Sequence, residues 1–376
     1  MTTRQADYVV VGAGLLGLAA GRALARRGRE VTVLEQVSAG HPGAGSKGSC
    51  RIFRLGYDDP AYVRAARQSR ELWHALEDHC SRKILYPTPQ LTTGAGLAAV
   101  REAMTAAGAP TELLSAAEAS ARFPGVRVDG PALLEPESAV TAADVALAAL
   151  AAGVPDIRTG VRVSALADDG RRVTLETSQG PLSARAAVIC AGPETAGLLG
   201  GALPSAPTLE QVAYLEPADQ GGADGADGAT EAGMPIFLCH DEQIPYGLPV
   251  PGSPRYKFGL HHSGPPVRPG ASQDQSADPA LVRQLEEMAR RYLPGCRPRP
   301  VQLERCVYDN TPDEDFILDR IGNVVVGCGT SGHGFKFGPL LGEWLAALAI
   351  GEDALAGGDE LAGLAARLRL GRPGLG

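Results

Sequence analysis

The chain has 376 residues, 44% hydrophobic and 21% charged, which is the composition of a folded protein with two or three domain-sized cores. Its formal net charge is −8 and its Lys and Arg residues are scattered, so a nucleic-acid surface is not expected. No apolar run reaches the length of a transmembrane helix, so a membrane span is not expected either.

The two ends of the chain and its cysteines predict a cytoplasmic location. The first predicted strand begins at residue 8, which leaves no room for a signal peptide, and residues 372–376 carry no lipidation or peroxisomal signal. The seven cysteines stand singly and none forms a CxxC motif. This pattern predicts neither a disulfide framework nor a zinc site, so no metal is expected.

The N-terminal stretch has the pattern of a dinucleotide-binding fold. A β-branched run at residues 8–11 leads into the motif Gly-Ala-Gly-Leu-Leu-Gly, a helical segment and a second strand. Gly12 allows the chain to reverse, Gly14 allows the backbone to approach a diphosphate, and Gly17 allows the helix to lie close to the sheet.

Two features at the ends of these elements predict ligand contacts. The first helical N–H groups, from Leu15 onward, face the phosphates, and the helix dipole favours their negative charge. Glu35 ends the second strand, where a carboxylate accepts hydrogen bonds from ribose hydroxyls and disfavours NADP. The alternative is a glycine-rich turn in an ordinary α/β domain.

A loop and two arginines follow. Residues 40–51 are rich in glycine and include Ser46, so we expect a loop that runs along the cofactor. Arg51 and Arg54 flank two apolar residues, which implies burial around the two charges. The alternative is a pair of surface arginines.

In the middle of the chain, the sequence is predicted to leave the nucleotide-binding domain and later to return to it. Asp59 precedes a proline, which predicts a capped helix that ends near residue 78. Residues 91–140 are alanine-rich and form shorter pieces. Thr141 and Asp144 resemble a capping box that opens a helix and marks the return.

Three signals follow in chain order. Residues 161–177 predict a hairpin around Asp-Asp-Gly. The apolar strand at residues 186–190 ends in a small-residue turn, as expected where a sheet passes under a dinucleotide, although any buried strand can end in this way. Residues 219–233 offer almost nothing to bury, which predicts a surface loop.

A strand at residues 255–261 is predicted to have two different faces. Three apolar side chains share one face, while Lys257 and His261 share the other with a glycine between them. The second face therefore offers an amine and an imidazole beside a gap. The alternative is a half-exposed strand with a solvated lysine.

A second glycine-rich loop lies near the C-terminus. A capped helix at residues 279–292 and three short strands lead to this loop at residues 327–338, which precedes a helix at residues 339–349. Its N–H groups suit the anionic end of a flavin ring system. The alternative is a loop that only connects two elements.

Together, these motifs resemble the sarcosine oxidase and N-methyltryptophan oxidase family of FAD-dependent amine oxidases, within the D-amino acid oxidase-like superfamily. The resemblance covers nearly the whole chain. It rests on the N-terminal glycine motif, on Arg-Ile-Phe-Arg followed by Tyr57, on Tyr246-Gly-Leu-Pro with Lys257 beyond it, on Cys306-Val-Tyr with Thr-Pro-Asp-Glu at residues 311–314, and on Ser-Gly-His-Gly-Phe-Lys-Phe at residues 331–337.

The resemblance implies an α/β fold in which a Rossmann-like FAD-binding domain is interleaved with an antiparallel-sheet substrate domain. The FAD-binding domain would comprise residues 1–90, 141–210 and 296–376. The substrate domain, which is the catalytic domain, would comprise residues 91–140 and 211–295. A monomer is expected because the resembling enzymes commonly are monomers.

The resemblance also implies the roles of individual residues. Cys306 is the position at which the family attaches FAD covalently, through a thioether to the 8α carbon. Lys257 lies near flavin N5 and assists the reduction of O₂, with Arg51 near the same edge. Arg54 and Lys336 bind the substrate carboxylate.

The remaining implied positions complete the site. The substrate cavity is lined by Tyr246, His261 and Tyr308, and the residues expected to take part in catalysis are Lys257, Arg51, His261 and Tyr308. The residues expected to bind the cofactor are Gly12, Gly14, Leu15, Gly17, Glu35, Ser46, Cys306, Gly332, His333, Gly334 and Lys336.

The reaction implied by the resemblance is the oxidation of a secondary-amine amino acid, either N-methylated or cyclic. The substrate loses the equivalent of a hydride to FAD and becomes an imine, and O₂ is reduced to hydrogen peroxide. Ser46, Lys47, Ser49 and Cys50 replace the family's usual histidine, acid and threonine, which favours a substrate other than sarcosine. The alternatives are a primary amino-acid oxidase, an NAD-linked dehydrogenase and a non-catalytic flavoprotein.

Overall fold

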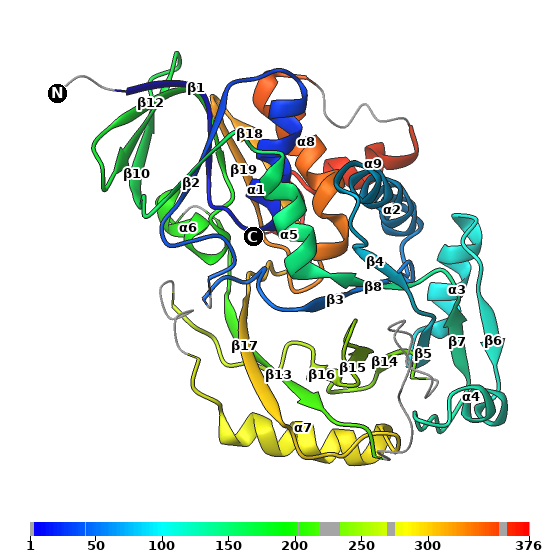
Figure 1. The fold of residues 1–376 in the computed structure, drawn as a ribbon. Coiled ribbons are helices and arrows are strands. Elements are labelled where there is room, and N and C mark those ends of the chain that lie inside the picture. Colours follow the sequence, from blue (N-terminus) through cyan, green and yellow to red (C-terminus); the bar gives the residue numbers. More distant parts are fainter. Residues whose placement is uncertain are drawn as a thin grey trace.

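The computed structural model describes residues 4–41, 43–201, 203–218, 234–268, 275–352 and 359–375; the loop predicted at residues 219–233 lies outside them. The fold has two large sheets, with helices packed beside the first and a long helix beneath the second (Figure 1). A mixed α/β fold with a Rossmann-like sheet and a largely antiparallel second sheet was predicted, and this prediction is confirmed.

The first sheet, called here the parallel sheet, carries the nucleotide pattern. Strand β1 lies at its centre and pairs in parallel with β2 and β12, and β9 and β19 extend this parallel core on its two sides. The predicted hairpin is present as β10 and β11, which pair antiparallel. The strands are β1 (Arg4–Val11), β2 (Val31–Glu35), β9 (Asp156–Thr159), β10 (Val163–Asp168), β11 (Val173–Thr177), β12 (Leu182–Ile189), β18 (Ile317–Ile321) and β19 (Val324–Cys328).

Three helices lie side by side against the parallel sheet: α1 (Leu15–Arg26), α5 (Ala143–Ala152) and α8 (Gly338–Ile350). Small residues make this close packing possible. A Cβ atom at Gly342 of α8 would lie 2.5 Å from Cβ of Ala19 in α1, and a Cβ atom at Gly17 would lie 1.9 Å from the carbonyl oxygen of Gly12. The predicted role of Gly17 in close helix packing is therefore confirmed.

We expect Gly17→Ala to lower the free energy of unfolding of the holoprotein by about 1–3 kcal/mol, because the added methyl group forces α1 away from β1. Denaturant titration measures this change. Gly363→Ala in α9 is the control, since no atom outside the neighbouring backbone of its own helix lies within 4 Å of the added Cβ, and it should raise stability by about 0.4–1 kcal/mol. Equal stability of Gly17→Ala and the parent protein would contradict the packing argument.

The second sheet, called here the antiparallel sheet, has the strand order β17-β13-β16-β15-β14-β5-β7-β6. All its pairings are antiparallel except that of β14 with β5. Helix α7 (Pro279–Tyr292) packs beneath it (Figure 1). The strands are β5 (Gln90–Gly94), β6 (Glu112–Leu114), β7 (Ala132–Glu135), β13 (Thr208–Leu215), β14 (Ile236–His240), β15 (Pro245–Pro249), β16 (Tyr256–Leu260) and β17 (Gln302–Tyr308).

The division of the chain into two domains remains a prediction. One strand of the segment assigned to the FAD-binding domain lies in the other sheet. Residues 296–376 were assigned to the FAD-binding domain, yet β17 pairs with β13 over its whole length in the antiparallel sheet. The predicted two-faced strand is present as β16. Tyr256, Phe258 and Leu260 enter the core beneath the antiparallel sheet, and Lys257 faces the other way and is only 5% exposed.

A small sheet connects the two large ones. It consists of β3 (Cys50–Phe53), β8 (Ala139–Ala142) and β4 (Leu85–Pro87) in the order β3-β8-β4. The predicted capping box at Thr141 is wrong, because Thr141 lies inside β8 opposite Arg51 and is fully buried. Helix α5 starts two residues later, and its N-cap residue Ala142 makes no side-chain cap.

The remaining helices surround these sheets. Asp59 caps α2 as predicted, since its carboxylate accepts a hydrogen bond from the backbone N–H of Ala61. No helix among the described residues is long and apolar enough to cross a membrane. The helices not yet given are α2 (Pro60–Cys80), α3 (Leu97–Ala106), α4 (Ala116–Arg122), α6 (Thr195–Leu198) and α9 (Asp359–Arg367), and two 3₁₀ turns span Gly192–Glu194 and Phe335–Phe337.

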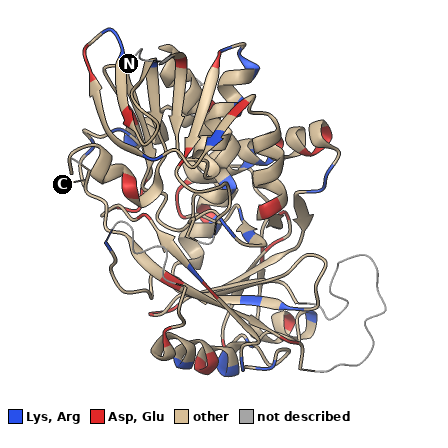
Figure 2. Cartoon of the chain, turned by 60° about the vertical axis from the view of Figure 1, so that its left-hand side comes forward, with Lys and Arg blue, Asp and Glu red and all other residues tan. Residues whose placement is uncertain are grey.

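Positive and negative residues are intermixed over the described chain, as Figure 2 shows most clearly along α7 at the base of the molecule. This helix carries three arginines and two glutamates within nine residues.

Candidate active site

One cavity of about 520 Å³ extends from the glycine motif of β1 to the inner face of the antiparallel sheet. This volume lies within the range of cofactor and substrate sites. Gly17 does not line the cavity, consistent with its packing role. All other predicted site residues line it: Gly12, Gly14, Leu15, Glu35, Ser46, Arg51, Arg54, Tyr246, Lys257, His261, Cys306, Tyr308, Gly332, His333, Gly334 and Lys336.

The nucleotide end of the cavity is organised around Glu35. Its carboxylate accepts hydrogen bonds from the backbone N–H groups of Ala13 (2.9 Å) and Val37 (3.0 Å). Ser46 Oγ accepts a hydrogen bond from the N–H of Leu15 at 3.0 Å, which joins the loop after β2 to the start of α1. Gly12 has a φ of +99°, and a Cβ atom there would lie 2.4 Å from the carbonyl oxygen of Cys190.

These residues fit the adenosine diphosphate half of a dinucleotide. An ionised carboxylate has about four acceptor positions, so Glu35 retains capacity for ribose hydroxyls after its two backbone hydrogen bonds. Gly14 presents bare backbone to the cavity, because a Cβ atom there would approach only Ser46 Oγ, at 3.3 Å. The N-terminus of α1 also faces the cavity through Leu15 and Leu16, where its dipole favours phosphate.

The C-terminal glycine loop forms the opposite wall. The Cβ positions of Gly332 and Gly334 are blocked by the Tyr308 ring at 2.2 Å and by Thr330 at 2.6 Å. His333 is held at both ring nitrogens, since Nδ1 lies 3.1 Å from Tyr57 Oη and Nε2 lies 3.0 Å from the backbone oxygen of Glu314. The loop therefore has a fixed shape against the cavity.

Lys257 and Arg51 form a first pair of cations. Lys257 Nζ donates a hydrogen bond to the backbone oxygen of Cys50 at 3.2 Å and lies 5.6 Å from the ring centroid of Tyr214. Burial lowers the pKa of Lys257, and the charge of Arg51 lowers it further, while Glu304 opposes the change. Arg51 donates hydrogen bonds to the backbone oxygens of Cys50, Gly45 and Lys47, which fixes its guanidinium beside the cavity.

Arg54 and Lys336 form a second pair of cations around one tyrosine. The Arg54 guanidinium lies 4.2 Å from the ring centroid of Tyr57, and Lys336 Nζ donates hydrogen bonds to Tyr57 Oη at 2.9 Å and to the His333 backbone oxygen at 2.7 Å. Burial lowers the pKa of Lys336 well below its usual range, and Arg54 adds to this effect. Among the described residues, the Arg54 guanidinium contacts the Tyr57 ring and makes no hydrogen bond or ion pair.

Three rings form the wall of the cavity on the side of the antiparallel sheet. Burial raises the pKa values of the Tyr246 and Tyr308 hydroxyls, so both remain neutral. Burial, followed by the charge of His262, lowers the pKa of His261 to about 3. His261 is therefore a neutral imidazole near pH 7.

Cys306 also faces the cavity, from β17. Burial raises the pKa of its thiol, whereas Arg51, Lys257 and Lys47 act in the opposite direction and favour the thiolate. None of the seven cysteines, all of which are described, forms a disulfide. The sequence identified Cys306 among them only through the family resemblance.

Sequence reasoning missed several supporting residues. Tyr57 belonged to a quoted motif, but its contacts with Lys336 and His333 could not be foreseen. Glu135 is 1% exposed, lies near Lys336 and accepts hydrogen bonds from Gly56 N–H, Gln90 and Thr92. It belongs to the alanine-rich segment at residues 91–140, in which no sequence pattern indicated a site residue. Glu304 accepts a hydrogen bond from Tyr214 and is equally unmarked in the sequence.

The sequence of the chain matches a known family. The family model described as FAD dependent oxidoreductase matches residues 7–348 of the chain. The chain belongs to the FAD-dependent oxidoreductase family. It is thus an enzyme whose cofactor is FAD, and the nucleotide end of its cavity fits that cofactor.

Individual relatives agree with this identification and with the predicted resemblance. This FAD-dependent oxidoreductase is 31% identical over 363 residues to monomeric sarcosine oxidase from Bacillus sp. (strain NS-129), covering 91% of this chain and 92% of the relative. It is 30% identical over 370 residues to N-methyl-L-tryptophan oxidase from Salmonella heidelberg (strain SL476), covering 92% and 95%. The open form of NikD, an unusual amino acid oxidase essential for nikkomycin biosynthesis, superposes with a TM-score of 0.80 at 26% identity and covers 93% and 95%.

Proposed function

We propose that this enzyme oxidises the secondary amine of a small amino acid, N-methylated or cyclic, to an imine, with reduction of O₂ to hydrogen peroxide. FAD supplies the redox chemistry when it is bound. The observation that carries the proposal is the pair of cations on Tyr57, because Arg54 and Lys336 offer a carboxylate site in the same cavity as the FAD-binding residues. The sarcosine and N-methyl-L-tryptophan oxidases named above act on amines of this class.

The carboxylate would be held by two kinds of donor. The Arg54 guanidinium presents two parallel N–H groups, which match the two oxygens of a carboxylate. Lys336 acts as a point charge, and its position is set by Tyr57 and by the backbone of His333. A negative substrate group would oppose the effects of burial and of the Arg54 charge, which together lower the pKa of Lys336.

The charges of the cavity favour the reactive form of the amine. Oxidation needs a neutral amine, and a second positive charge is disfavoured beside Arg54 and Lys336. The neutral His261 imidazole can exchange hydrogen bonds with the amine without adding charge. Lys257, with Arg51 beside it, would stabilise the negative charge that develops as O₂ is reduced.

We expect the affinity for a carboxylate to fall as pH rises, and to do so well below pH 10.5, because burial lowers the pKa of Lys336 well below that usual lysine value. Below its folded-state pKa Lys336 is an ammonium and attracts the carboxylate, and above it the charge is lost. Acetate carries no amine, so its binding, measured from the flavin spectrum across pH, isolates this group. Lys336→Met should remove the pH dependence, and a pH-independent affinity in the parent enzyme would contradict the assignment.

FAD is proposed to be attached to Cys306 through a thioether. The support is the position of Cys306 in the cavity wall and the nearby cations that favour its thiolate. We expect the denatured native protein to retain its yellow colour and to show the mass of the polypeptide plus one FAD. Cys306→Ser should release FAD on denaturation, whereas Cys296→Ser, outside the cavity, should retain it. Release of all FAD from the parent protein would contradict the tether.

A substrate screen tests the proposed reaction. The holoprotein is mixed without oxygen with N-methyl, cyclic and primary amino acids, and loss of flavin absorbance is recorded. Fastest bleaching by a secondary amine supports the proposal. Preference for a primary amino acid identifies the alternative oxidase, a need for NAD indicates a dehydrogenase, and no bleaching with any amine indicates a non-catalytic flavoprotein.

The compartment, the oligomeric state and the domain boundaries also remain proposals. A cytoplasmic enzyme is supported by the lack of disulfides among the seven cysteines, which suits a reducing compartment. A monomer is supported by a relative that is named monomeric. The division into an FAD-binding and a substrate domain is supported by the separate cores on either side of the cavity.

A further inference from the structure

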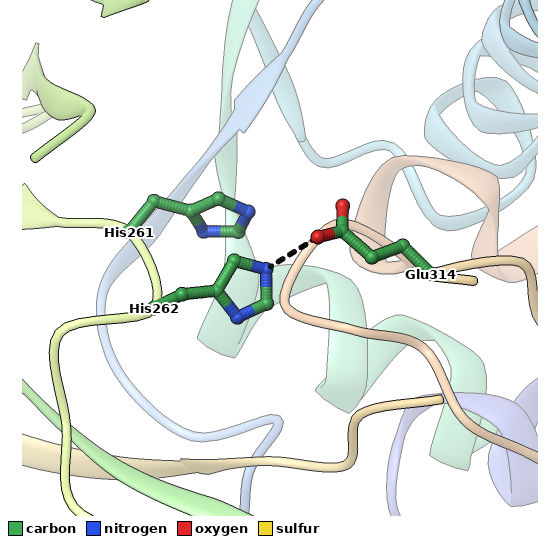
Figure 3. Close-up of side chains that lie close together, drawn as sticks. All are labelled: His261, His262 and Glu314. Atoms are coloured by element: carbon green, nitrogen blue, oxygen red, sulfur yellow. Dashed lines mark ion pairs between the residues drawn. The ribbon is translucent and has the colours of Figure 1, made fainter. Parts of the chain in front are cut away.

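Three potential metal ligands meet at the edge of the cavity. His261 and His262 follow β16 of the antiparallel sheet, and Glu314 lies in the loop between β17 and β18 (Figure 3). One ligand atom from each residue lies within 4.8 Å of the other two. Among residues 4–41, 43–201, 203–218, 234–268, 275–352 and 359–375, this is the only group of three or more His, Cys, Asp or Glu residues close enough to bind one metal ion.

The contact between His262 and Glu314 has the spacing of two ligands on one ion. His262 Nε2 lies 3.4 Å from Glu314 Oε1 (Figure 3). This buried nitrogen has no hydrogen-bond partner in the described chain, so the contact does not have hydrogen-bond geometry. Two ligand atoms about 2.0–2.1 Å from a tetrahedral zinc ion stand about 3.3–3.4 Å apart. The two side chains already have this separation.

The third ligand, His261, lies directly beside the second at the end of β16. Its ring centroid lies 4.0 Å from that of His262. Glu314 is exposed, so its side chain can rotate to complete the site.

The backbone holds the ligands in place. His262 and Glu314 have φ values of 55° and 60°, which are uncommon for residues other than glycine. The N–H of His261 donates to the backbone oxygen of Ile244, and the backbone oxygen of Glu314 accepts from His333. The backbone positions of the three ligands are therefore set by hydrogen bonds from two different segments.

We propose that His261, His262 and Glu314 bind one divalent ion of the zinc class at the edge of the cavity. Two imidazoles and one carboxylate suit Zn²⁺, Co²⁺ or Ni²⁺, whereas Ca²⁺ and Mg²⁺ prefer oxygen ligands alone. Three protein ligands leave the fourth position of a tetrahedral ion open. Arg54 and Lys336 repel a cation, so the affinity is expected to be micromolar rather than that of a closed structural site.

A bound ion would act on the cavity through His261. This residue both lines the cavity and supplies a ligand, so the ion stands where substrate approaches. The ion would also join the end of β16 to the loop before β18. It is therefore expected to raise the thermal stability of the holoprotein and to inhibit turnover, and both effects should be reversed by a chelator.

Calorimetric titration of the holoprotein with Zn²⁺ tests this site without any assay of turnover, so its result does not depend on the proposed function. We expect one ion per chain, at least a tenfold weaker affinity in His262→Ala and Glu314→Gln, and no binding of Mg²⁺. His74→Ala is the matched control, because His74 pairs with Glu77 on the surface of α2 and should leave binding unchanged. No saturable binding up to millimolar Zn²⁺, or equal affinity in all variants, would overturn the proposal.

Discussion

Replacement of Lys257 by methionine should slow the reaction of the reduced enzyme with O₂ by about 100- to 1,000-fold, the range for loss of one preorganised charge from a buried site. Lys257 is 5% exposed, and its ammonium is held in position by a hydrogen bond to the Cys50 carbonyl and by contact with the Tyr214 ring. Methionine keeps the volume and removes the charge. Anaerobic bleaching by substrate should change by less than about tenfold, because no carboxylate contact is lost.

Rapid mixing separates the two half-reactions. The anaerobic bleaching rate reports oxidation of the amine, and the return of flavin colour on addition of O₂ reports the second half. Lys83→Met is the matched control, since Lys83 also lies over a tyrosine ring, that of Tyr86 at 4.9 Å, but outside the cavity. Equal slowing of both half-reactions in Lys257→Met would remove the proposed role in O₂ reduction.

Replacement of Arg54 by alanine should weaken the binding of a substrate carboxylate by about 10- to 100-fold, the range for loss of a charge-assisted hydrogen-bonding group. The reason is the position of its guanidinium, which stacks on Tyr57 and has no partner among the described residues other than this ring. KM should rise much more than kcat falls, because the carboxylate contact is present before and during the reaction.

The control for this variant is Arg291→Ala. Arg291 stacks on Tyr292 at 4.8 Å and lies outside the cavity, so its removal tests the loss of a cation from a tyrosine ring in general. Acetate affinity should fall in Arg54→Ala and remain constant in Arg291→Ala. If Arg54→Ala binds acetate as tightly as the parent enzyme, Arg54 does not hold the carboxylate.

The nucleotide fold was predictable because its signals are local. Glycine at three fixed positions, a β-branched strand before them and an acid after the second strand each have one physical reason, and all fall within thirty residues. Strand alternation also separated Lys257 from the core residues of β16, but it left a solvated lysine open as the alternative, which its 5% exposure now excludes. Its assignment to O₂ reduction came only from the family resemblance and still awaits the test above.

The rest of the site depends on contacts between distant segments. Tyr57 contacts Lys336, which lies 279 residues later in the sequence, and no local sequence pattern predicts such a pair. The prediction of a capping box at Thr141 was wrong for a similar reason. Its local pattern was adequate, but pairing of β8 with β3 and β4 extends the strand over the position where the cap was expected.

The short strand β3 sets a limit on how this site can change. Arg51 lies within it and Arg54 follows directly after it, so about 10 Å of extended chain joins the two cation pairs. Neither pair can shift alone without altering the pairing of β3 with β8. Adaptation to a longer or bulkier substrate is therefore expected on the facing wall, at Tyr246, His261 and Leu238, where side-chain size can vary while the spacing of the charges stays constant.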